Sequence, residues 1–208
     1  MTPFSVLHVC MGNICRSPMA ERLLMLAAQQ RLAKIGAALA LGDLLRSASA
    51  GTGGWHEGEQ MNPPAARQIQ LRGGSADGFA ARKLVTAQLA EADLILTATA
   101  DQLDYVHALL PDAVDRTFVL GHLSRLLAEV DAAALPPASI TPDGFSARAG
   151  AVVAAVERIR GDTPAIHDDD LDDPWGRGDQ TFQRIADDID EALYAFVDAL
   201  LPGAPRPA

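Results

Sequence analysis

A cysteine and an arginine stand in one short loop near the start of the chain, within the stretch HVCMGNICRSPMAE at residues 8–21. Five residues separate Cys10 from Arg16, and Ser17 follows directly. A thiolate is a nucleophile, and a guanidinium can hold two oxygens of a phosphate at once. Gly12 and Asn13 tolerate the positive φ angles that turn successive N–H groups toward an anion. These residues predict a thiolate that faces a bound phosphate.

The elements on either side of this loop must position it. The apolar run at 5–10 predicts a strand, and Ser17 followed by Pro18 predicts the cap and first position of a helix. A helix N-terminus offers unpaired N–H groups and about half a positive elementary charge, which favours both a bound anion and a thiolate at Cys10.

Strand-like and helix-like segments alternate along the chain. We expect strands at 5–10, 44–49, 92–99 and 116–121, and helices at 18–33, 63–72, 86–91, 101–110 and 146–160. A last helix, capped by Asp179, has apolar residues at three- and four-residue steps: Phe182, Ile185, Ile189, Leu193, Phe196 and Leu200. This alternation favours an α/β fold, a parallel sheet with helices on both faces. We expect one domain over 1–201, with a Pro-rich insertion at about 131–145 and a flexible tail at 202–208.

Composition narrows the partners and the compartment. The 208 residues carry a formal net charge of -10, which disfavours binding to nucleic acid or to an anionic membrane surface. The longest apolar stretch is interrupted by Asp43, well short of a membrane span. Cys10 and Cys15 are the two cysteines of the chain and suggest no disulfide framework, so we expect a reducing, cytoplasmic location.

The loop sequence VCMGNICRSP closely resembles that of the low-molecular-weight protein tyrosine phosphatase family, V-C-x-G-N-I-C-R-S-P. The resemblance continues through SAGTGGWHEG (49–58), ARKL (81–84), ADLILT (92–97) and DDPWGRGDQTF (172–182). It implies a flavodoxin-like three-layer sandwich, with a four-stranded parallel sheet in the order 2-1-3-4. In such a sheet the ligand lies at the carboxyl ends of the strands, where the loop opens.

The resemblance also implies the site. Cys10 would be the nucleophile, Arg16 the clamp, and Asp173 in Asp173-Pro174-Trp175 the general acid, with Asp172 as the neighbour most easily confused with it. Phosphate would be held by Met11, Gly12, Asn13, Ile14, Cys15, Arg16 and Ser17. Asn13 and Ser49 would brace the loop, Ser17 would donate to the Cys10 sulfur, and Trp55 and Trp175 would form the rim. The family usually has a histidine where this chain has Phe79, so one brace differs.

The implied reaction is hydrolysis of phosphotyrosine or other aryl phosphate monoesters through a cysteinyl-phosphate, without metal or other cofactor. The substrate would be a phosphotyrosine protein or a small aryl phosphate. Two alternatives stay open: arsenate reduction with a small thiol cofactor, and a non-catalytic anion-binding signalling module. Cys15 either packs behind the loop or pairs with Cys10 on oxidation. The other carboxylates of DDDLDD (168–173) are expected to lie in a solvated loop, and none of the five histidines is assigned a catalytic role.

Overall fold

The computed structural model describes residues 2–201; the expected tail at 202–208 lies outside the described residues. Its centre is a four-stranded parallel sheet of β1 (Phe4–Cys10), β2 (Leu45–Gly51), β3 (Leu94–Thr97) and β4 (Thr117–Val119). The strand order is β2-β1-β3-β4, which confirms the predicted topology. In this register Cys10 lies opposite Gly51, at the carboxyl end of both strands.

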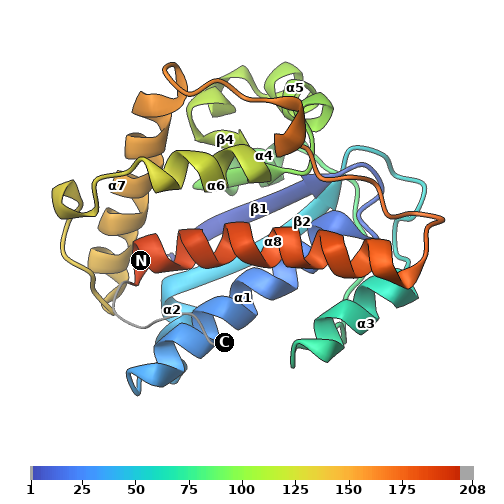
Figure 1. The fold of residues 1–208 in the computed structure, drawn as a ribbon, viewed down its shortest axis with the longest axis horizontal. Helices are drawn as coiled ribbons and strands as arrows, with labels where there is room; N and C mark the ends of the chain where they lie inside the picture. Colours follow the sequence, from blue (N-terminus) through green and yellow to red (C-terminus); the bar gives the residue numbers. More distant parts are fainter. Residues whose placement is uncertain (1, 202–208) are drawn as a thin grey trace.

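Helices lie on both faces of the sheet (Figure 1), and alternate residues of β1 belong to two different cores. Val6 and Cys10 belong to the core beneath α1 (Arg16–Lys34), α6 (Leu120–Ala128) and α8 (Asp179–Leu200). Leu7 and Val9 pack on the other side, against residues of α4 (Thr86–Glu91) and α5 (Ala100–Leu109). Both faces of a parallel sheet are thus covered, as its apolar strands require.

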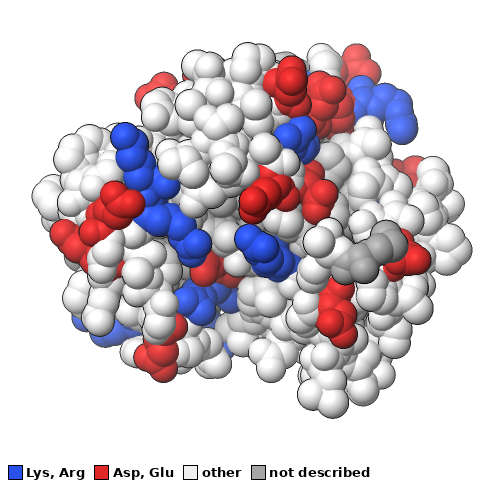
Figure 2. All heavy atoms as spheres, turned by 180° about the vertical axis from the view of Figure 1, so that it is seen from behind, with Lys and Arg blue, Asp and Glu red and all other residues white. Residues whose placement is uncertain are grey.

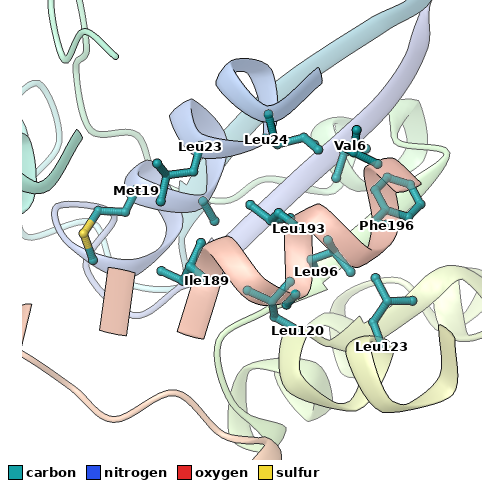
Figure 3. Close-up of a cluster of buried hydrophobic side chains, with 14 of the residues drawn as sticks. Val6, Met19, Leu23, Leu24, Leu96, Leu120, Leu123, Ile189, Leu193 and Phe196 are labelled. Atoms are coloured by element: carbon teal, nitrogen blue, oxygen red, sulfur yellow. The ribbon is translucent and has the colours of Figure 1, made fainter. Parts of the chain in front are cut away.

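Helix α8 lies across the sheet and buries the apolar face that the sequence predicted. All six of its apolar residues named from the sequence are buried. Ile189, Leu193 and Phe196 meet residues of the sheet and of α1 and α6, among them Leu24, Leu96 and Leu123 (Figure 3). Burying a side chain of this size contributes roughly 1.5–3 kcal/mol, so this helix is a main stabiliser of the sheet that carries the loop.

Several predicted boundaries were wrong. Helix α8 is capped by Gly178, and the Asp179 carboxylate instead pairs with Arg67 at 2.6 Å. The expected strand at 116–121 ends at Val119, because residues from Leu120 onward form α6. The strand expected at 92–99 is shorter, since Thr97 is its last residue.

The remaining helices complete the layers. Helix α2 (Leu41–Leu44) precedes β2, and α3 (Pro63–Leu71) begins at the predicted residue. Helix α7 (Pro142–Arg160) begins earlier than expected, because the Thr141 hydroxyl accepts from Gly144 N–H at 3.3 Å. The last part of the Pro-rich insertion is therefore helical. Short 3-10 turns lie at Ala38–Ala40, Pro111–Arg116, Ala132–Ala134 and His167–Asp169.

Within residues 2–201 no helix is both long and apolar enough to cross a bilayer. The face opposite to that of Figure 1 carries basic and acidic side chains interspersed among uncharged ones (Figure 2). An anion is therefore drawn to a local arrangement of donors rather than to a broad basic surface on this face.

Candidate active site

The Cys10 side chain ends β1 and lies inside the curl of the loop that follows. Its sulfur accepts a hydrogen bond from Asn13 N–H at 3.3 Å and lies 3.0 Å from the Ser17 hydroxyl. Asn13 adopts a φ of 54°, the left-handed conformation that the sequence predicted for a curled loop. Ser17 thus occupies the position predicted for a donor to the Cys10 sulfur.

A buried polar network braces the loop from behind. The Asn13 amide donates to Ser17 Oγ at 2.9 Å and to Ser49 Oγ at 2.8 Å, while its carbonyl accepts from Arg82 N–H at 2.8 Å. Ser49 in turn donates to Glu21 Oε2 at 2.6 Å. The predicted neighbours Asn13, Ser17 and Ser49 are thus brought together.

Glu21, which was not predicted as a site residue, is buried on α1 and extends this network through its bond from Ser49. An acidic residue on the face of α1 that packs on the core was the signal that could have revealed it. Phe79, which stands where the family usually has a histidine, is buried and, being apolar, makes no such brace. The side-chain carbonyl of Asn13 instead accepts a hydrogen bond from Arg82 N–H. Close packing also shapes the loop: a Cβ on Gly51 would lie 2.8 Å from the Met11 carbonyl oxygen.

Helix α1 begins one residue before the predicted cap. Its N-cap is Cys15, with no side-chain hydrogen bond, so the prediction that Ser17 caps the helix was wrong. The Ser17 hydroxyl faces the loop interior instead, toward Cys10 and Asn13. Since no side chain caps it, the positive end of the helix dipole remains available to an anion at the loop.

Arg16, in the first turn of α1, places its guanidinium beside the Cys10 loop. The side chain is buried, its Nη1 donates to the Leu171 carbonyl at 3.0 Å, and its Nη2 lies 2.9 Å from Asp173 Oδ2. A residue early in the chain is thus joined to the candidate acid near its end. The guanidinium is held by the loop that carries Asp173.

That acidic loop is anchored rather than freely solvated. Leu171 N–H donates to Ala98 O at 2.8 Å, and Asp170 accepts from Ala100 N–H at 2.8 Å, which joins the loop to the end of β3. Asp169 is buried and receives two hydrogen bonds of 2.7 Å from Arg125. Burial alone would raise the pKa of Asp169, but the hydrogen bonds from Arg125 and Ile166 N–H outweigh it and lower the pKa.

The expectation that only Asp173 matters in this acidic run was therefore incomplete, because Asp169 and Asp170 position it. Asp172 points elsewhere and pairs with Arg184 at 2.6 Å. Helix α6 approaches this loop so closely that a Cβ on Gly121 would lie 2.4 Å from the Asp169 carbonyl oxygen.

The Cys10 loop and the loop that carries Asp173 together line a pocket of about 320 Å³. Cys10 and Arg16 lie among its lining residues together with Asp173, and the two exposed tryptophans expected at the rim, Trp55 and Trp175, line it as well. His56, which the sequence reading left unassigned, also lines the pocket, and its Nδ1 lies 2.8 Å from Glu59. The pocket thus joins the loop that is predicted to bind an anion to aromatic walls.

Cys15 lines the same pocket but differs from Cys10 in its surroundings. Burial, together with the negative charges of Cys10 and Asp173, raises the pKa of the Cys15 thiol to about 12. It is therefore a neutral thiol near pH 7, packed in the core behind the loop. Its pairing with Cys10 on oxidation stays a prediction.

A parallel α/β sandwich with a cysteine-arginine anion loop after its first strand defines a phosphatase-like class of protein. A family model described as low molecular weight phosphotyrosine protein phosphatase matches residues 5–147. The chain belongs to this family and is an enzyme of the protein-tyrosine-phosphatase class. The match ends before Asp173, so the acid assignment depends on the geometry above and on the motif Asp173-Pro174-Trp175.

Relatives of known name agree with this membership. The low molecular weight protein-tyrosine-phosphatase of Streptomyces coelicolor is 35% identical over 142 residues, which cover 68% of this chain and 78% of the relative. Protein-tyrosine phosphatase A of Mycobacterium tuberculosis is 43% identical over 108 residues, or 52% of this chain and 57% of the relative.

Solved structures share the fold. Vibrio vulnificus Wzb in complex with benzylphosphonate aligns with a TM-score of 0.62 at 20% identity, over 94% of this chain and 97% of the other. The YwlE arginine phosphatase of Geobacillus stearothermophilus aligns with a TM-score of 0.60 at 20% identity, over 94% and 92% of the two chains.

Proposed function

We propose that this enzyme hydrolyses phosphotyrosine in proteins, or other aryl phosphate monoesters, through a phosphoryl group carried on Cys10. The observation that supports it most is that the Cys10 loop, the Arg16 guanidinium and the Asp173 carboxylate line one pocket between two tryptophans. A flat phenyl ring fits between aromatic walls, and its phosphate reaches the loop beneath them.

In the first step the Cys10 thiolate attacks phosphorus and the bond to the leaving oxygen breaks. Asp173 supplies the proton that this oxygen needs, while Arg16 and the loop N–H groups stabilise the charge on the other phosphate oxygens. In the second step Asp173 takes a proton from water, the water oxygen bonds to phosphorus, and the Cys10–phosphorus bond breaks. Ser17 Oγ, at 3.0 Å from the sulfur, would stabilise the departing thiolate.

Each group in this scheme belongs to the chain itself, so the reaction needs no cofactor. We also propose a cytoplasmic location, since both cysteines are free thiols and Cys10 must stay reduced to act.

The direct test is Cys10→Ser, with Cys15→Ser as the matched control. We expect Cys10→Ser to lose turnover of an aryl phosphate by about 10³-fold or more, because a serine hydroxyl is a poor nucleophile in this loop. Mass spectrometry after acid quench should find phosphate on Cys10 in the wild type and in Cys15→Ser. Wild-type turnover by Cys10→Ser would overturn the covalent scheme. Arsenate-dependent thiol consumption without aryl phosphate turnover would assign the loop to arsenate reduction.

A further inference from the structure

A second pocket, of about 600 Å³, is lined by residues of α1, α6, α7 and α8 and of the segment that leads to α7. Its apolar wall includes Leu127, Val130 and Leu135, and the last of these belongs to the Pro-rich insertion. None of its lining residues lines the Cys10 pocket. Asp198 and Ala199 place it at the far end of α8 from Asp179, about 30 Å away at 1.5 Å per helical residue.

Two buried arginines, Arg31 and Arg148, also line this pocket. Arg31 is 7% exposed; its Nη2 bonds to Asp198 Oδ1 at 2.7 Å, and its buried Nη1 has no hydrogen-bond partner among the described residues. Arg148 is 4% exposed and donates to two carbonyls, from Nε to Ala199 O at 2.7 Å and from Nη1 to Pro136 O. The buried Nη1 of Arg31 carries a desolvation cost that an accepting oxygen of an anion would offset.

We infer that this pocket binds a small amphipathic molecule with a single negative charge, such as a carboxylate on a short apolar chain. The head group would accept a hydrogen bond from Arg31 Nη1, and the chain would lie on the wall of Leu127, Val130 and Leu135. Glu191 and Asp198 also line the pocket, so its four charged side chains sum to zero. That balance disfavours a phosphate dianion, and the one unpartnered donor, Arg31 Nη1, matches a head group with a single charge.

The Pro-rich insertion has a structural part in this site. Its Pro136 carbonyl holds Arg148, and Leu135 supplies apolar surface. Residues 135–141 of the insertion form no regular helix. A role in binding would explain why this segment packs beside the pocket. The site goes beyond the proposed phosphatase reaction, and no residue of that reaction takes part in it.

The test measures binding of octanoate to the full chain by calorimetry, with octanamide as the uncharged probe. We expect octanoate to bind at least tenfold more tightly than octanamide, and to bind equally well to Cys10→Ser. In NMR spectra the shifted amides should cluster around residues 127–135 and 194–199. Equal affinities for the two octyl probes, or shifts confined to the Cys10 loop, would overturn the proposal.

Two variants with a control locate the binding. Arg31→Gln should weaken octanoate binding at least tenfold, whereas Arg46→Gln, which removes an exposed arginine outside the pocket, should leave it unchanged. If Arg31→Gln does not fold, Ala132→Trp supplies the second measurement, since a large side chain at this exposed lining position narrows the pocket without changing charge. Unchanged octanoate affinity in Ala132→Trp would also contradict the assignment.

Discussion

The neighbouring carboxylates Asp172 and Asp173 have different partners, and the difference assigns them different roles. Asp173 lies 2.9 Å from Arg16 Nη2 in the pocket, while Asp172 pairs with Arg184. If Asp173 protonates the leaving oxygen, its contribution to the rate of Cys10 phosphorylation depends on how basic that oxygen is. Asp173→Asn should slow phosphorylation of Cys10 by about 10²–10⁴-fold for phenyl phosphate and only slightly for p-nitrophenyl phosphate. Pre-steady-state bursts measure this step separately from hydrolysis of the intermediate.

Asp172→Asn is the matched control for this prediction. It removes a carboxylate one position away, so its rates should show no dependence on the leaving group. Equal losses on both esters in Asp173→Asn would mean that Asp173 only holds Arg16 in place. A leaving-group dependence in Asp172→Asn would move the acid to Asp172.

Arg16 gives a second prediction for a single residue. Its two terminal nitrogens point to different partners, Leu171 O and Asp173, and a lysine ammonium cannot reproduce this fork. Arg16→Lys should therefore lower kcat/KM for aryl phosphates by at least about tenfold, or 1.4 kcal/mol, although the charge is kept. Steady-state kinetics measure the loss; a smaller one would mean that Arg16 acts as a point charge.

Among the elements, those defined by local periodicity could be predicted from the sequence. Helix α8 and the strand β1 were expected within a residue or two of their bounds, because their apolar spacing reports which face is buried. The cap at Ser17 was wrong because its hydroxyl serves the Cys10 loop, a tertiary contact that overrides a local preference. The partners of Glu21 and Asp169 could not be predicted, since Ser49 and Arg125 are each distant from them in the sequence.

Strand β1 carries a buried histidine, His8, whose protonation makes the stability of the fold depend on pH. His8 is 1% exposed, its Nε2 lies 3.1 Å from Ser47 Oγ, and burial lowers the pKa of His8 from 6.5 to about 3. The folded state thus keeps His8 neutral, whereas the unfolded chain binds a proton below pH 6.5. Stability from this residue is present above pH 6.5 and is lost as pH falls from 6.5 toward 3.

Urea unfolding at pH 7 and pH 5 tests this prediction with His8→Leu. Since one pKa unit is worth about 1.4 kcal/mol, the wild type should lose about 2 kcal/mol more free energy of unfolding than the variant between these pH values. The acidic residues titrate in both proteins and cancel in the comparison. Parallel losses in the two proteins would mean that His8 is protonated in the folded state.

For the whole molecule, the net charge of -10 opposes the anion that the Cys10 loop binds. The loop overcomes this repulsion at short range, through Arg16 and the N-terminus of α1, whereas a long substrate also meets the surrounding field. A phosphotyrosine peptide with flanking lysines should therefore have a higher kcat/KM than one with flanking glutamates. We expect about a tenfold preference at low ionic strength, because the field concentrates the cationic peptide near the site.

Salt separates this field from local contacts. The Debye length falls from about 30 Å at 0.01 M to about 3 Å at 1 M ionic strength, so the preference should shrink severalfold across this range. A peptide with flanking glutamines should lie between the two charged peptides and respond least to salt. A preference for lysine that persists in 1 M salt would instead indicate contacts with acidic side chains beside the pocket. Glu59, which is exposed and paired with His56 at the pocket wall, is the residue whose substitution by glutamine would then abolish it.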